Sequence, residues 1–206
     1  MPPHEAAAWL RQQFEQWQGQ PPAGVLGYDQ TLRELLPQPL IPAAVLIPLV
    51  LRESGLTVLL TRRTAHLRDH AGQISFPGGR CEAADGSPQV TALREAQEEV
   101  GLKSTQVEIL GCLPEYCTAT GFSITPVVGL VTPPLNLKLD DFEVADVFEP
   151  PFVFLMNGEN HQRHQVEFQG ALRDYYAMPW NDHFIWGATA GMLVSLQRFL
   201  YATRDE

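Results

Sequence analysis

The sequence predicts an α/β protein in which one sheet is covered by helices on both faces. Strand-like apolar segments alternate with segments of helical periodicity, and the last segment of the chain is again helical. Helices that lie between and after strands are typical of such a layered architecture. A length of 206 residues with 45% hydrophobic residues fits one domain with its own core and a terminal addition.

The N-terminal segment Glu5–Gln18 predicts a helix that packs on the main body. One face of it carries apolar residues at i, i+4 and i+7, namely Leu10, Phe14 and Trp17. The segment Gln20–Gly24, rich in Pro and Gly, then ends the helical pattern. We therefore expect residues 1–22 to form an added helix and residues 40–204 to form the main domain.

Seven segments have the length and composition of strands. They are Ala43–Arg52, Leu56–Arg62, Gln73–Phe76, Val107–Cys112, Ile124–Val131, His164–Phe168 and Leu172–Met178. Hairpin turns are expected at residues 53–55 and near Gly170, so part of the sheet is expected to be antiparallel. Residues 132–140 predict a loop, whereas residues 143–154 are ambiguous because two prolines interrupt them.

Two further helices are expected, at Pro88–Val100 and Phe184–Tyr201. The first has clear end signals, because Ser87 can cap its N-terminus, Pro88 suits the first helical position and Gly101 follows its end. The second is amphipathic and closes the chain.

The charge balance and the cysteine usage exclude some classes of protein. A formal charge of −10 and a pI near 5.0 argue against a general nucleic-acid binder, because affinity for phosphates comes largely from basic surface. No secretory signal or membrane-spanning apolar run is recognisable, and three cysteines without a CxxC pair fit a reducing compartment. We expect a soluble, cytoplasmic protein with no nucleic-acid and no membrane partner.

Three glutamates gather on one side of the helix expected at residues 88–100. At about 100° per residue, Glu95, Glu98 and Glu99 fall within an arc of roughly 100°. The opposite side carries the apolar residues expected to be buried, Val90, Leu93, Ala96 and Val100. Like charges at this spacing repel each other, and Arg94 offsets only part of that repulsion. A divalent cation such as Mg²⁺ or Mn²⁺ would relieve it, since these ions prefer oxygen ligands; a solvated acidic face is the alternative interpretation.

A glycine turn precedes this helix. Residues 76–79 read Phe-Pro-Gly-Gly, and paired glycines let a backbone carbonyl or amide approach a metal or a phosphate without an intervening Cβ. Glu82 and Asp85 stand in the loop between the turn and the helix. The sequence thus predicts a strand–turn–loop–helix unit with oxygen ligands converging at one end.

Residues 79–102 resemble the Nudix box, G-x5-E-x7-R-E-U-x-E-E-x-G-U, in which U is apolar. Residues 94–102 match its second half in full, with Ala96 at the apolar position. In the first half, Asp85 stands in place of the early glutamate, and eight residues rather than seven separate it from Arg94. The resemblance implies a Nudix-type α/β/α sandwich with a mixed, partly antiparallel sheet, and a hydrolase acting on a nucleoside diphosphate linked to another group.

The resemblance also implies roles for single residues. The expected ligands of Mg²⁺ or Mn²⁺ are the carbonyl of Gly78 and the carboxylates of Glu95, Glu98 and Glu99. Arg94 is expected to orient these carboxylates. Metal ions neutralise a diphosphate and lower the pKa of the attacking water, whose proton a carboxylate then accepts. Either Glu95 or Glu143, in a downstream loop, is expected to be this base.

The run Leu59–Gly79 is a basic exception in an acidic chain. Its arginines are candidates for contacts with substrate phosphates, and they are Arg62, Arg63 and Arg68. The run resembles the additional motif of the coenzyme A pyrophosphatase subfamily, approximately L-L-T-x-R-[ST]-x3-L-x3-x-G-x-x-x-F-P-G-G, with Thr64 at the Ser/Thr position and Gly72 at the interior glycine. This resemblance implies coenzyme A or acyl-CoA as the substrate, cleaved to adenosine 3′,5′-bisphosphate and 4′-phosphopantetheine or its acyl form.

Other functions stay open at this point. One is a Nudix enzyme for ADP-ribose or oxidised nucleoside triphosphates, and another is a Nudix-like domain that binds a nucleotide without cleaving it. A structural domain with an acidic helix would leave the glycine turn and the basic run unexplained. The sequence also leaves open the acyl-chain preference and the oligomeric state, with a homodimer as one option.

Overall fold

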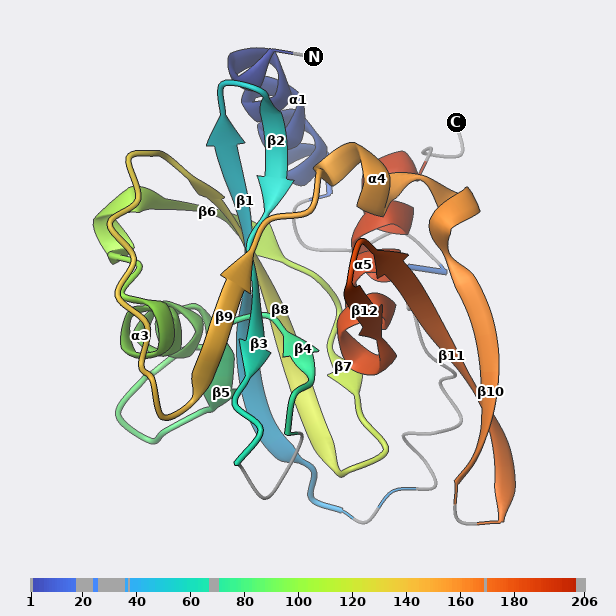
Figure 1. Ribbon diagram of the computed structural model, residues 1–206. Helices are drawn as coiled ribbons and strands as arrows, with labels where there is room; N and C mark the ends of the chain where they lie inside the picture. Colours follow the sequence, from blue (N-terminus) through green and yellow to red (C-terminus); the bar gives the residue numbers. More distant parts are fainter. Residues whose placement is uncertain are drawn as a thin grey trace.

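A mixed sheet forms the centre of the fold (Figure 1). The computed structural model describes residues 2–17, 24–25, 36, 38–66, 71–168 and 170–202. The strand order is β2-β1-β8-β6, and these strands are Gly55–Val58, Ile41–Arg52, Phe122–Val131 and Val107–Cys112. β1 and β8 run parallel, whereas β2 and β6 are antiparallel to their neighbours. This mixture of directions confirms the predicted fold class.

Two short strands extend the central sheet. β5 (Gly78–Arg80) pairs antiparallel with the first half of β1, and β7 (Tyr116–Cys117) pairs antiparallel with β8. β5 is the segment that the sequence predicts as a glycine turn. Its pairing with β1 places the two glycines at the sheet, directly before the loop that leads into the next helix.

Alternate residues of β1 face two separate cores, one on each side of the sheet. Ala44, Leu46 and Val50 belong to the core that α3 (Pro88–Val100) covers. On the opposite face, Ile47 and Leu49 belong to the larger core. All five side chains are buried. A strand that is buried on both faces has a continuous run of apolar residues, so β1 could be predicted from the sequence.

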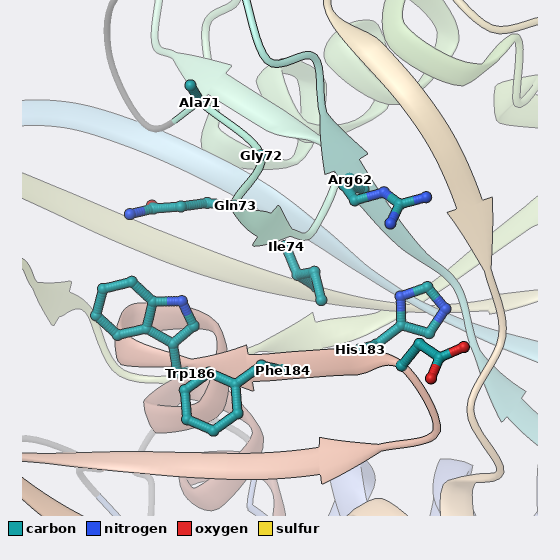
Figure 2. A pocket seen from close by; sticks show the side chains of 9 residues that line it. Arg62, Ala71, Gly72, Gln73, Ile74, His183, Phe184 and Trp186 are labelled. Carbon is teal, nitrogen blue, oxygen red and sulfur yellow. The ribbon is translucent and has the colours of Figure 1, made fainter.

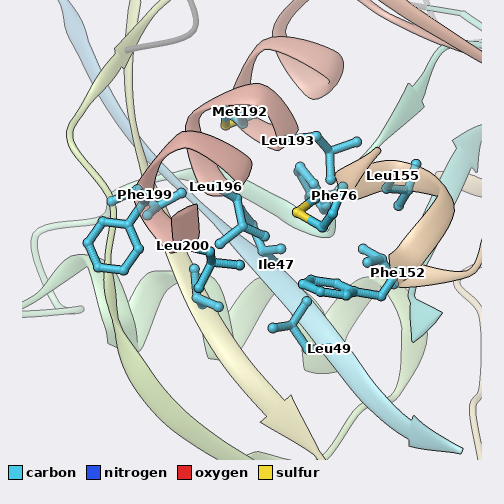
Figure 3. Close-up of a cluster of buried hydrophobic side chains, with 14 of the residues drawn as sticks. Ile47, Leu49, Phe76, Phe152, Leu155, Met192, Leu193, Leu196, Phe199 and Leu200 are labelled. Carbon is cyan, nitrogen blue, oxygen red and sulfur yellow. The ribbon is translucent and has the colours of Figure 1, made fainter. Parts of the chain in front are cut away.

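Three helices cover the larger core. They are α1 (Pro3–Gln16), α4 (Phe152–Met156) and α5 (Gly187–Tyr201). Figure 3 shows Leu196 and Leu200 of α5 close to Ile47 of β1, with Phe76 and Phe152 nearby. α1 packs on this layer through the rings of Phe14 and Phe199, whose centroids are 4.6 Å apart. Among the helices of the described part of the chain, none is long and apolar enough to cross a membrane.

Two smaller sheets complete the structure. One has the order β4-β3-β9, with strands Ile74–Ser75, Leu60–Arg63 and Val144–Phe148. The other has the order β10-β11-β12, with strands Gln162–Phe168, Ala171–Trp180 and His183–Trp186. Short 3-10 turns occupy Ser104–Gln106 and Gly158–Asn160. The segment expected as one strand at residues 56–62 is therefore divided between the central sheet and the first smaller sheet.

The start of the last helix differs from the prediction. Residues 184–186 belong to β12, which pairs with β11, and α5 begins only at Gly187. The exposure of the side chains explains the difference, because Phe184 and Trp186 are exposed while Ile185 between them is buried. This alternation has the period of a strand. The ambiguous residues 143–154 divide similarly, since β9 ends before the prolines and α4 begins after them.

Candidate active site

The helix α3 carries the three glutamates and has the ends that the sequence predicts. The hydroxyl of Ser87 accepts a hydrogen bond from the amide of Val90, and Gly101 closes the helix in the left-handed conformation with φ of 70°. The buried face differs from the expected one. Val90 is 47% exposed, whereas Glu99 is only 6% exposed and lies among the buried residues of the helix. One of the three carboxylates is thus turned into the protein.

The glycines of β5 bring the backbone into contact with α3. Gly78 and Gly79 pair with Val45 and Ala44 of β1. A Cβ on Gly79 would collide with the carboxylate of Glu95, while a Cβ on Gly78 would lie 2.5 Å from the carbonyl oxygen of Ala44. Both positions therefore require glycine, the first because a functional carboxylate lies against the backbone and the second because the strands pack closely.

Arg94 connects the acidic residues of the site to one another. Its Nε and Nη2 atoms donate to the two carboxylate oxygens of Asp85, at 3.0 and 3.1 Å. Its Nη1 atom donates to Glu95 at 2.9 Å and to Glu98 at 3.0 Å. The guanidinium also donates to the carbonyl of Arg80 at 3.2 Å, next to the glycines. A planar group with several donors can hold several carboxylates in fixed relative positions.

Asp85 is held firmly in this arrangement. Besides Arg94, its carboxylate accepts hydrogen bonds from the hydroxyl of Thr91 at 2.7 Å and from the amide of Glu82 at 2.9 Å. The hydrogen bonds from Arg94, and then those from Glu82 and Thr91, hold the pKa of Asp85 well below its usual range. The longer spacing before Arg94 therefore still allows the early acid to meet the arginine.

The carboxylate of Glu99 lies in the least favourable electrostatic environment of the site. Burial raises its pKa to about 8, and the negative charges of Glu143 and Glu95 add to the effect. Arg63 and a hydrogen bond from the backbone of Gly78 oppose it only in part. Burial also raises the pKa of Glu95, although Arg94 acts against this rise. By contrast, the side chain of Glu98 is 60% exposed.

Glu143 lies close to α3 although it is distant in sequence. Its carboxylate is 3.9 Å from Arg63, and its backbone carbonyl accepts from the amide of Thr64 at 3.0 Å. The amide of Asp140 donates to the carbonyl of Glu99 at 2.9 Å, which fixes the loop to the end of the helix. The structure thus brings Glu143 near Glu95 and Glu99, and Arg63 near Glu99.

Arg62 and Arg63 separate in space. Arg63 faces Glu143, whereas Arg62 forms an ion pair with Asp146 at 3.1 Å. Arg62 also lines an open pocket of about 390 Å³, which residues of β12 line as well (Figure 2). Neighbouring residues of a strand point to opposite sides, so only one of the two arginines faces the carboxylates. Arg68, the third candidate for a phosphate contact, lies outside the described residues.

The profile of the NUDIX domain matches residues 40–177. The chain belongs to the Nudix hydrolase family. It is 45% identical over 156 residues to "Uncharacterized Nudix hydrolase NudL" of Enterobacter sp. (strain 638), which covers 75% of this chain and 80% of that one. It is 41% identical over 155 residues to the protein of the same name of Escherichia coli (strain K12), with the same coverage. The solved Nudix hydrolase from Nitrosomonas europaea superposes with a TM-score of 0.50 at 19% identity, over 80% of this chain and 72% of that one, which supports the fold alone.

The Nudix glutamates of this chain have the chemistry of a site for a hard divalent ion. The carboxylates of Glu95, Glu98 and Glu99 supply the oxygen atoms that such ions prefer, and Glu95 lies beside a backbone that approaches without a Cβ. Within the described residues, no three acidic, histidine or cysteine side chains converge closely enough to hold an ion in the positions shown. In these positions the Nη1 atom of Arg94 contacts both Glu95 and Glu98.

Sequence reasoning missed the pocket next to this Nudix site. Asp182 and His183 line it together with Phe184 and Trp186, and none of the four was a candidate. A signal was present, because the short apolar run from 184 to 186 is as compatible with a strand as with a helix.

Proposed function

We propose that this Nudix hydrolase cleaves the diphosphate bond of coenzyme A or acyl-CoA. The products would be adenosine 3′,5′-bisphosphate and 4′-phosphopantetheine or its acyl form. The observation that carries the proposal is the run Leu59–Gly79, which resembles the coenzyme A pyrophosphatase motif at nearly every fixed position. This run includes β3, β4 and the beginning of β5, and it ends at the glycine that touches Glu95. The end of this run therefore meets the carboxylate helix at Gly79.

The acidic residues have distinct parts in this proposal. Glu95, Glu98, Glu99 and the carbonyl of Gly78 would hold Mg²⁺ or Mn²⁺. Such an ion, when bound, neutralises charge on the diphosphate and lowers the pKa of the attacking water. Arg94 keeps two of the carboxylates in place, and Asp85 keeps Arg94 in place. Arg94 and Asp85 are thus positioning residues.

Arg63 is the cation best placed to meet a phosphate at these carboxylates. Its guanidinium lies 3.9 Å from Glu143, which is a long ion pair, and its side chain is about a quarter exposed. A substrate phosphate can therefore compete for the guanidinium without breaking a close, buried contact. Because the chain as a whole carries a formal charge of −10, such a local cation has to offset the general repulsion of an anionic substrate.

Two carboxylates are candidates for the base that takes the proton of the attacking water. The carboxylate of Glu95 is partly occupied, because it accepts a hydrogen bond from Arg94 and lies against Gly79. Glu143 is more exposed, at 42% of its side chain, and its ion pair with Arg63 is long, at 3.9 Å. A base near the ion needs an accessible lone pair and a raised pKa. Glu143 meets the first requirement, because its side chain is exposed. Glu95 meets the second, because burial raises its pKa.

The test is an analysis of products. Purified protein is incubated with coenzyme A and Mg²⁺ or Mn²⁺, and parallel reactions contain ADP-ribose and oxidised dGTP. The proposal expects adenosine 3′,5′-bisphosphate to appear from coenzyme A faster than cleavage products appear from the other two substrates. Preferential cleavage of ADP-ribose would assign the enzyme to another Nudix substrate class. Absence of cleavage for every substrate would favour a binding domain.

A further inference from the structure

The pocket that Arg62 lines lies between two walls that come from distant parts of the chain. One wall is the turn and strand of residues 71–74, and the other is formed by Asp182, His183, Phe184 and Trp186. Figure 2 shows the rings of Trp186 and Phe184 on one side of the opening, with Gln73 and Ile74 across from them. From these observations we infer that the pocket binds the adenine base of the substrate. The inference deepens the proposed function, since it rests on coenzyme A being the substrate.

The two walls are fixed relative to each other. The amide of Arg63 donates to the carbonyl of Gln73 at 2.9 Å, and β3 and β4 pair through Arg62 and Ile74. Across the pocket, the hydroxyl of Thr189 at the start of α5 donates to the carbonyl of Ile74 at 2.9 Å. The bond from Thr189 links the two walls, whereas the bond between Arg63 and Gln73 fixes the first wall to β3. A preformed site loses little conformational entropy on binding.

The exposed rings favour a flat ligand. Phe184 is 46% and Trp186 is 39% exposed, so both rings present apolar surface at the pocket that they line. Each ring is held at its side by another aromatic residue: Tyr175 meets Trp186 at 69°, and His164 meets Phe184 at 67°. Rigid aromatic surfaces of this kind stack on bases, because every base has a π face.

The polar lining separates a base from an acyl or pantetheine chain. An alkyl chain over Arg62, Gln73 and Asp182 would remove water from these groups without offering hydrogen bonds in return, which is costly. Adenine carries a donor at N6 and an acceptor at N7, and side-chain amides and carboxylates are complementary to such edges. The chemistry of the walls therefore selects the adenosine half of coenzyme A.

The pocket is also close enough to the carboxylates for one molecule to occupy both. Ile74 of the wall and Gly78 of the site are four residues apart, so at most about 14 Å of extended backbone separates them. In addition, Arg62 and Arg63 are consecutive residues of β3, one facing each place. A nucleotide whose base lies in the pocket can thus present its diphosphate to the carboxylates.

The experiment measures binding of adenosine 3′,5′-bisphosphate by calorimetry in the presence of Mg²⁺. This molecule has no diphosphate bond, so it binds without being cleaved by the proposed reaction. Replacement W186A is expected to raise its Kd at least about fivefold, as loss of one stacking partner implies. W186F keeps an aromatic surface and is expected to stay within about threefold of the wild type. V166A is the matched control, because Val166 is 47% exposed on the neighbouring hairpin but does not line the pocket.

The outcomes separate this inference from the proposed function. F184A repeats the measurement on the second ring, in case W186A changes the thermal stability. An unchanged Kd in both alanine variants, or a wild type that does not bind the bisphosphate, overturns the adenine site. So does a loss of affinity for 4′-phosphopantetheine instead of adenosine 3′,5′-bisphosphate. The proposed function fails in a different way, namely when the wild type does not cleave coenzyme A although it binds the bisphosphate through Trp186.

Discussion

Arg94 joins Asp85 through two parallel hydrogen bonds while the third nitrogen of its guanidinium reaches both Glu95 and Glu98. One side of the arginine is therefore anchored to an acid that lies outside the helix, and the other side sets the positions of two carboxylates on it. This arrangement leads to the first prediction.

Asp85→Asn should lower kcat by about 10- to 100-fold, the usual effect of removing an outer partner of a metal-binding residue. The physical reason is that Arg94 loses its anchor and no longer fixes Glu95 and Glu98. The measurement is kcat at saturating substrate together with the Mg²⁺ concentration for half-maximal rate. Glu82→Gln is the control, because only the backbone of Glu82 takes part. Wild-type kinetics in the Asp85 variant would contradict the positioning role.

Glu98→Gln should lower turnover by more than about 100-fold, which exceeds the effect expected for Asp85→Asn, while the fold is retained. The side chain is 60% exposed, so its replacement costs little stability, yet it is an expected direct ligand. Turnover and the thermal unfolding temperature are measured on the same samples, with Glu167→Gln on exposed β10 as the charge-matched control. A Glu98 variant that turns over normally would remove this residue from the metal site.

The stability of the metal-free protein should fall as the pH rises from about 5 to above 8. The folded state raises the pKa of Glu99 to about 8, so between its ordinary pKa of 4.5 and 8 the folded state binds a proton that the unfolded state has lost. The stabilising effect of that proton is complete below pH 4.5 and is lost as the pH passes 8.

Glu99→Gln removes this group, and in EDTA its unfolding temperature should exceed that of the wild type more at pH 8.5 than at pH 6. Each kcal/mol corresponds to about 2–4 °C for a chain of this size. Addition of Mg²⁺ should stabilise the wild type at pH 8.5 more than the variant. Parallel pH curves for the two proteins would show that Glu99 does not titrate as described.

Gly79→Ala and Gly78→Ala should fail in different ways. The new methyl group at position 79 meets the mobile end of Glu95, so activity should fall about tenfold or more with little loss of stability. At position 78 it meets the backbone of β1, so the unfolding free energy should fall by about 1–3 kcal/mol. Gly158→Ala is the control, since nothing lies within 4 Å of its added Cβ. Equal loss of stability at 78 and 79 would argue against this distinction.

Local signals made the carboxylate helix predictable to the residue. Ser87, Pro88 and Gly101 act through hydrogen bonds and backbone angles within a few residues, so the ends of α3 need no tertiary information. The face that α3 buries could not be predicted in the same way, because the burial of Glu99 depends on tertiary contacts such as the hydrogen bond from the backbone of Gly78.

Contacts between distant segments also decide the other features that differ from the predictions. Residues 184–186 carry a pattern that fits a helix or a strand, and pairing with β11 decides between them. The separation of Arg62 from Arg63 depends on Asp146 and Glu143, which lie about eighty residues away in the sequence. The sequence of the run Leu59–Gly79 alone therefore does not show which of these two arginines faces the carboxylates and which faces the pocket.

The pairing of β3 with β9 has a consequence for how this protein can change over evolution. The register between these strands shifts at Arg62 and Arg63. This register determines which guanidinium faces the carboxylates and which faces the pocket. Sliding β3 by a single position would turn Arg62 toward the carboxylates and Arg63 toward the pocket, and would separate each guanidinium from its present partner, Asp146 or Glu143. Insertions should therefore be tolerated in the turn beyond Thr64 but not within the four residues of the strand.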